Sequence, residues 1–82
     1  MEYVITCRRP GQMPQTFSRF HVLTETDAVS SLKNAAFRLA TTGRYGRYPS
    51  GDAFVPELMK GLSPNGQAWT SSDGTVLELV KI

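Results

Sequence analysis

The stretch from Thr24 to Gly43 carries the strongest local pattern in the chain and constrains its fold the most. Its apolar residues recur at helical spacing and form a single stripe, made of Ala28, Leu32, Ala35, Ala36 and Leu39. Thr24 and Asp27 form a variant of the capping box at the start of this helix, and Gly43 is suited to end it. Because the stripe is mostly Ala, we predict an amphipathic helix that lies close against a sheet.

Four other segments have the composition of β-strands. Residues 2–8 and 16–23 flank a loop with two prolines and a glycine, which predicts an antiparallel hairpin with a long tip. Residues 67–70 and 75–82 flank Ser71-Ser72-Asp73-Gly74, in which Asp-Gly is the usual signal for a two-residue hairpin turn. The last segment is apolar on both faces, which predicts a central strand or one covered on both sides.

These elements predict the order β-β-α-β-β, with a short helix before the third strand. That helix would be a short one within residues 52–61, with Pro56 in its first turn and Gly61 at its end. A chain of 82 residues with 40% apolar residues has room for one core. We therefore predict a single α+β domain over residues 1–82, in which one amphipathic helix packs on one face of a small antiparallel sheet.

Three aromatic residues test this arrangement. Alternation along residues 16–23 places Phe20 on one face of its strand and Phe17 on the other. Phe37 falls on the polar side of the predicted helix, near Lys33. Either a later segment, such as the helical turn over residues 52–61, covers Phe37, or Phe37 is an exposed anchor at an interface.

Positive charge is concentrated in the first half of the chain. Residues 1–48 hold seven Lys and Arg against three acidic residues, a net charge of +4, and residues 49–82 hold two against four, a net charge of −2. All six Arg belong to the first half. This asymmetry suggests a basic face for an anionic partner, although scattered solvated charges would give the same count.

Few residues are suited to catalysis or metal binding. The chain has one Cys, Cys7, and one His, His21, with no further ligand at metal-binding spacing. The two fall on adjacent predicted strands, so a Cys–His nucleophile pair is an alternative to a buried thiol and a surface imidazole. Phosphate-binding and hydrolase motifs are missing. We expect no enzyme, no catalytic residue, no cofactor and no metal.

The expected location is the cytoplasm. The longest apolar run falls far short of the ~20 residues that span a bilayer, and the N-terminus lacks the pattern of a signal peptide. The low cysteine content agrees with a reducing compartment.

Residues 43–51 are the main candidate for a contact surface. Arg44 and Arg47 supply planar cations that match phosphate or carboxylate, and Tyr45 and Tyr48 supply rigid amphipathic rings. We expect these four residues to bind a partner. The supporting residues would be Arg8, Arg9, Arg38 and Phe37. The alternative is a solvated loop whose tyrosines cover the edge of the core.

The run from Phe20 to Ala36, a strand followed by an acidic cap and an Ala-rich helix, resembles small β-β-α-β proteins of bacteriophages. These include inhibitors of host RNA polymerase and anti-CRISPR proteins. The resemblance is architectural and transfers no functional residue. It implies a compact, non-catalytic viral protein that inhibits or modulates a larger host complex by steric occlusion. The net basic charge argues against mimicry of nucleic acid.

Two other functions stay open from the sequence. The same loop could bind nucleic acid directly, with arginines on phosphates and tyrosines stacked on bases. The chain could also be a structural subunit of a phage particle or a homo-oligomer assembled through its last strand. A monomer and a homodimer are both compatible with the sequence.

Overall fold

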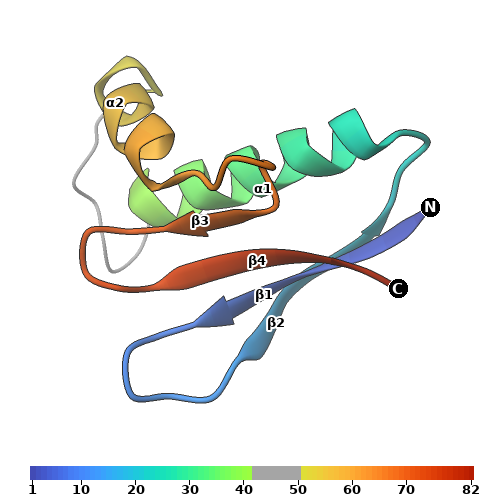
Figure 1. The fold of residues 1–82 in the computed structure, drawn as a ribbon, viewed down its shortest axis with the longest axis horizontal. Helices are drawn as coiled ribbons and strands as arrows, with labels where there is room; N and C mark the ends of the chain where they lie inside the picture. Colours follow the sequence, from blue (N-terminus) through green and yellow to red (C-terminus); the bar gives the residue numbers. More distant parts are fainter. Residues whose placement is uncertain (42–50) are drawn as a thin grey trace.

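The computed structural model describes residues 1–41 and 51–82. The elements follow in the order β1 (Glu2–Arg8), β2 (Gln15–His21), α1 (Glu25–Thr41), α2 (Gly51–Gly61), β3 (Ala68–Thr70) and β4 (Val76–Lys81). Both helices lie on the same side of the sheet (Figure 1). The predicted α+β class and the order β-β-α-β-β with a short second helix are therefore confirmed.

The four strands form one antiparallel sheet in the order β2-β1-β4-β3. The prediction of a central last strand is confirmed, because β4 lies between β1 and β3. The two termini lie at the same end of the sheet (Figure 1), where the amide of Ile82 donates to the carbonyl of Glu2 at 2.9 Å. The face of β4 that carries Val80 stays partly exposed, so β4 is covered on one face only.

The hairpin of β1 and β2 contains a β-bulge that the alternation did not predict. Ile5 pairs with Ser18 and Thr6 pairs with Thr16, which leaves Phe17 as the extra residue. A bulge reorients the side chains beside it, so Phe17 and Phe20 both pack against the core instead of facing opposite sides. The prediction that Phe17 and Phe20 lie on opposite faces was therefore wrong.

Helix α1 begins as its sequence predicts. The amide of Asp27 donates to Oγ1 of Thr24 at 3.1 Å, which satisfies one of the free amides of the first turn. The small residues of the stripe let the helix lie directly on the sheet, where Ala28, Leu32 and Ala36 are fully buried. The predicted helix end at Gly43 lies outside the described residues.

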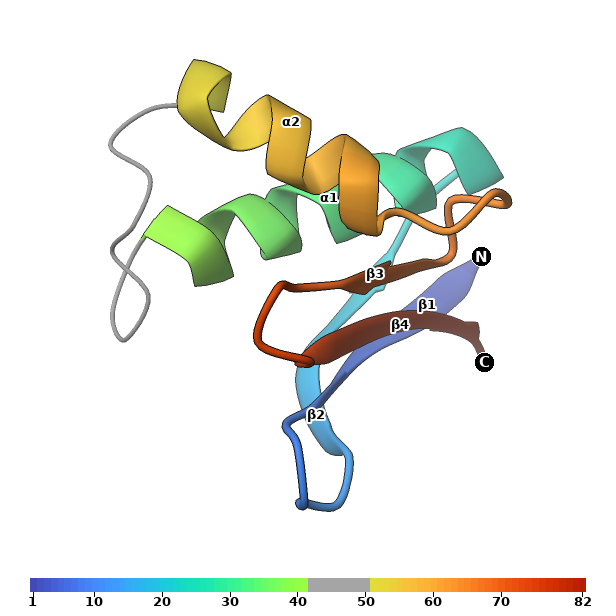
Figure 2. The ribbon, with the colours of Figure 1, turned by 60° about the vertical axis from the view of Figure 1, so that its left-hand side comes forward.

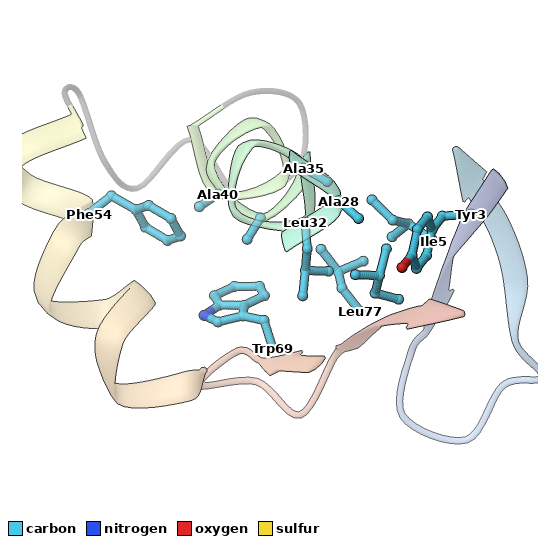
Figure 3. Close-up of a cluster of buried hydrophobic side chains, with 11 residues drawn as sticks. Tyr3, Ile5, Ala28, Leu32, Ala35, Ala40, Phe54, Trp69 and Leu77 are labelled. Atoms are coloured by element: carbon cyan, nitrogen blue, oxygen red, sulfur yellow. The ribbon is translucent and has the colours of Figure 1, made fainter. Parts of the chain in front are cut away.

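Helix α2 is longer than the predicted turn. It begins at Gly51, so Pro56 lies inside the helix instead of in its first turn. Its buried residue, Phe54, lies 5.8 Å from Phe37 and 5.7 Å from Trp69, measured between ring centroids. The side chain of Phe54 projects from α2 toward the space between α1 and Trp69 (Figure 3). Of the two alternatives for Phe37, cover by a later segment is the one observed, and its ring is half-buried.

The turn between β3 and β4 is one residue longer than Asp-Gly indicated. Thr70 pairs with Val76, and the amide of Ser71 donates to the carbonyl of Thr75 at 2.8 Å, so residues 72–74 form the loop. Gly74 has a φ of 89°, the left-handed conformation that three-residue hairpin loops need at their last position.

One cluster of apolar side chains fills the space between the helices and the sheet (Figure 3). It combines Ile5, Leu77 and Trp69 from the strands with the stripe of α1 and Phe54 of α2. Among residues 1–41 and 51–82, no helix lies on the opposite face of the sheet (Figures 1 and 2). Across residues 1–41 and 51–82, neither helix has the length and apolar character to cross a membrane.

Candidate functional site

The four residues predicted to form the main contact, Arg44, Tyr45, Arg47 and Tyr48, lie outside the residues that the structure describes. The predicted supporting residues, Arg8, Arg9, Arg38 and Phe37, are all described. Phe37 belongs to the packing between the two helices, where it meets Phe54.

Arg8 and Arg38 lie on opposite sides of the sheet. Tyr3 and Ile5 point from β1 into the core, and successive side chains of a strand point to opposite faces. Arg8 is three residues from Ile5, so it points to the face without helices, where it is exposed beside Val76. Arg38 belongs to α1, on the covered face. The structure therefore does not bring these two arginines onto one surface.

Arg9 starts the tip of the β1–β2 hairpin and is half-buried. Its carbonyl accepts a bond from the amide of Gln12 at 3.0 Å, which closes a turn with Gly11 in the left-handed region at a φ of 73°. Its Nη1 is buried and has no hydrogen-bond partner within the described part of the chain. Beyond this turn the side chain of Met13 is 83% exposed, so the hairpin tip presents both cationic and apolar atoms.

A groove of about 210 Å³ runs between β2 and α1. We call it the β2–α1 groove, and its lining residues are Ile5, Phe17, Ser18, Phe20, Ser31, Asn34, Ala35 and Arg38. Those on the strand side are mostly apolar, and those on the helix side are mostly polar. Arg38 was predicted as a contact residue, but the groove was not predicted. The available signal was the pair Phe17 and Phe20, whose odd spacing breaks strand alternation and indicates a bulge.

Strand β2 forms an edge of the sheet, and some of its backbone amides and carbonyls point away from β1. Met1 and Val22 exchange backbone bonds of 2.8 and 2.9 Å. Because antiparallel pairs alternate, Tyr3 with Phe20 is the next bonded pair, and the amides and carbonyls of Arg19 and His21 face outward.

The opposite edge of the sheet is closed. Leu62 forms a bridge with Trp69 of β3, and the amide of Ser63 donates to the carbonyl of Ala68 at 2.8 Å. The segment after α2 therefore occupies the outer side of β3. The two edges of the sheet differ in that only β3 has a neighbouring segment bonded along it within the described chain.

The charged side chain of Arg19 on β2 is paired with a carboxylate of β1. Nε of Arg19 donates to Oε1 of Glu2 at 3.0 Å on the face without helices. This hydrogen bond and the charge of the guanidinium lower the pKa of Glu2 from its ordinary value of 4.5, and the carboxylate raises the pKa of Arg19. Both side chains are exposed, so the pair adds little to stability. Among the described residues that line the groove, Arg38 is the charged one.

Cys7 and His21 do not form a pair. Cys7 is half-buried near the hairpin tip, where it pairs with Gln15, and His21 pairs with Glu2 at the other end of the same two strands. Nε2 of His21 lies 3.4 Å from the N-terminal nitrogen. Among residues 1–41 and 51–82, no group of three or more His, Cys, Asp or Glu side chains could hold a metal ion.

No protein-family model matches this chain, and no curated protein or solved structure matches it either.

Proposed function

We propose that the chain is a small, non-enzymatic binding protein that inhibits or modulates a larger complex by steric occlusion. The observation that carries this proposal is the open β2 edge beside the β2–α1 groove, which together offer backbone bonds and apolar contact on one surface. Backbone bonds give affinity, and side-chain pockets give specificity, in proteins that bind extended segments.

The Arg- and Tyr-bearing segment 44–48 is part of the same proposal. It follows α1, which carries Arg38, and its residue types are those enriched in contact surfaces. The resemblance to small phage proteins supports a host complex as the target, with an RNA polymerase or a CRISPR effector as the class of machine that is blocked.

The test is affinity capture of the partner from host cells with the tagged chain, followed by binding and activity measurements on the purified partner. We expect Tyr45→Ala and Arg47→Ala each to weaken binding by ~1–3 kcal/mol with an unchanged melting temperature. Lys60→Ala, which removes an exposed basic residue of α2, is the control and should bind as the wild type does. Normal binding by both loop variants excludes the segment from the contact, and a bound partner that keeps full activity excludes occlusion.

Direct binding to nucleic acid is a second candidate, favoured by the net charge of +4 in residues 1–48. It predicts that affinity for DNA or RNA falls with salt, with a slope of roughly one log unit per phosphate contacted. Fluorescence titrations with single- and double-stranded DNA and RNA at two salt concentrations test it, and no binding at low salt excludes it.

A further inference from the structure

We infer that the face of the sheet without helices packs on the same face of a second copy of this chain, which gives a weak symmetric dimer. This inference goes beyond the proposed function and does not depend on it. Its support comes from the apolar side chains on that face, from the register of the strands and from the charges between them.

The first observation is the apolar surface of this face. Alternation along β4 places Val76, Val80 and Ile82 on the side opposite the buried Leu77 and Leu79. Val80 is 37% exposed and Ile82 is 60% exposed. Across residues 1–41 and 51–82, no helix covers these side chains (Figures 1 and 2). One solvated face is common in antiparallel sheets, so the apolar side chains alone do not identify a partner.

The second observation is the register of the two central strands. Val4 of β1 pairs with Val80 of β4 in the strand order β2-β1-β4-β3. When two sheets pack face to face, a two-fold axis that runs along the strands between β1 and β4 lays β1 of each copy over β4 of the other. Val4 then lies over Val80 of the second copy, and Val80 lies over Val4. A symmetric interface requires this reciprocity, because the same patch must supply both sides of every contact.

The third observation is a pair of charges on the same face. Arg8 and Glu78 both point to it and are exposed, and neither has an ion-pair partner within the described part of the chain. In the arrangement above, Arg8 lies over Val76 of the second copy, two residues along β4 from Glu78. A long guanidinium side chain can therefore reach the carboxylate of the other copy. The symmetry of the dimer forms this contact twice.

The balance of charge on the face argues against highly charged partners. Among the described residues of β1, β2 and β4, the charged side chains on this face are Glu2, Arg8, Arg19 and Glu78, two of each sign. A nucleic acid or a strongly acidic segment therefore gains no long-range attraction from this face. A second copy carries the opposite charge for both Arg8 and Glu78 at the positions where symmetry needs it, and this complementarity favours a second copy as the occupant.

The size of the face predicts weak association. Strands of six or seven residues that are spaced by about 4.8 Å give a face of at most roughly 450 Å² on each copy. The total of roughly 900 Å² lies below the range of about 1,200–2,000 Å² that is typical of stable interfaces. We therefore expect a dimer that forms at high protein concentration and dissociates on dilution.

The test is sedimentation of the complete wild-type protein from micromolar to millimolar concentration, together with two charge variants. Arg8→Glu and Glu78→Arg each place like charges at both contacts, so each variant alone should associate at least tenfold more weakly than wild type. In an equimolar mixture of the two variants, opposite charges meet again at both contacts, and a mixed dimer should form with an affinity within threefold of wild type. Lys60→Glu and Glu57→Arg make the same changes of charge on α2, and neither variant nor their mixture should change association.

A further pair of variants tests the apolar contact. Val80→Lys places a charge where Val4 of the second copy lies, and Val55→Lys places the same charge at an exposed position of α2. We expect association at least tenfold weaker for Val80→Lys and unchanged for Val55→Lys. Thermal melts show whether each variant is folded, and if Val80→Lys unfolds, the mixture of Arg8→Glu with Glu78→Arg decides.

Three results would overturn the inference: a wild-type monomer at millimolar concentration, a dimer that none of the variants on the face weakens, or a mixture of the two charge variants that associates no better than either alone. The last result would mean that Arg8 and Glu78, which are diagonal neighbours in one sheet, act on each other within a copy. A monomeric chain that still captures and blocks a cellular partner would refute the dimer and leave the proposed function intact. A dimer without any cellular partner would refute the proposed function and leave the dimer intact.

Discussion

Gly61, the last residue of α2, determines how closely this helix approaches the edge of the sheet. A Cβ atom at this position would lie 2.8 Å from Nε1 and 3.0 Å from Cδ1 of Trp69, and closer still to the carbonyl oxygen of Thr70. The indole is buried and the carbonyl belongs to the backbone of β3, so neither atom group can move aside alone. We predict that Gly61→Ala displaces α2 and destabilises the protein.

Two opposing effects set the magnitude. Ala is favoured over Gly in a helix by at most about 1 kcal/mol. Overpacking a well-packed site costs about 1–3 kcal/mol, and contact with rigid backbone favours the upper part of that range. The expected net loss in the free energy of unfolding is therefore about 1–2 kcal/mol. For a domain of this size, a loss of 1 kcal/mol lowers the melting temperature by roughly 4–8 °C.

The assay is urea unfolding followed by the fluorescence of Trp69, the single tryptophan, which is 2% exposed. Gly11→Asn is the control, because Gly11 has no atom within 4 Å of its Cβ position and its φ of 73° is one that Asn tolerates. We expect a lower urea midpoint for Gly61→Ala only, with native fluorescence shifted to the red. If Gly61→Ala is as stable as wild type or more stable, the close docking of α2 on β3 is wrong.

Three further predictions concern stability. Thr24→Ala removes the oxygen that accepts from the amide of Asp27 and should cost about 1 kcal/mol in thermal unfolding, whereas Thr24→Ser should retain the cap. Phe54→Ala empties the centre of the helix–sheet interface and should cost about 3–5 kcal/mol in urea unfolding; a loss below 1 kcal/mol would contradict its burial. Arg19 lowers the pKa of Glu2 in the folded state. The stabilising effect of this ion pair is therefore fully present at a pH above the ordinary pKa of 4.5, and it disappears as the pH falls through the lowered pKa. Glu2→Gln should therefore lose slightly less stability than wild type when urea unfolding at pH 3 is compared with pH 7, and a greater loss than that of wild type would contradict a stabilising ion pair.

The elements that the sequence predicted well are those fixed by neighbours along the chain. The helix around Leu32 was predictable because its stripe and its cap at Thr24 are both local patterns. The central position of the last strand was predictable because Leu77 and Leu79 alternate with Val76 and Val80, so both faces are apolar.

The errors came from features that depend on pairing in space. Phe17 was assigned to the wrong face because a bulge appears only when one strand is set against its partner. The start of α2 was missed because Pro56 is read locally as a first-turn residue, whereas packing of Phe54 on Trp69 supports a helix that begins earlier. The turn before β4 was placed correctly at residues 71–74, but its loop length was not, because Asp73-Gly74 suits a two-residue turn and also a three-residue loop that ends in a left-handed glycine.

The candidate site illustrates the same limit. The concentration of arginines in the first half of the chain is visible in the sequence. Which face each one occupies depends on the direction of the Arg8 side chain in β1 and on the side of α1 that carries Arg38. The β2–α1 groove needs the bulge at Phe17, the small side chain of Ala35 and the register of the hairpin at once. No single stretch of the sequence contains that combination.

Binding at the open edge of β2 and the stability of the fold depend on different groups of atoms. Backbone groups that face water along β2 carry no desolvation penalty, so the fold loses nothing by leaving them unbonded. The core is built from other groups, with Leu77, Trp69 and Ile5 on the inner strands and on the closed edge. A change at Asn34, which is exposed and lines the groove, should therefore alter binding with little effect on unfolding. Changes at Gly61 or Phe54 should do the opposite, and a variant of either kind that altered both to the same degree would mean that the edge and the core are energetically coupled.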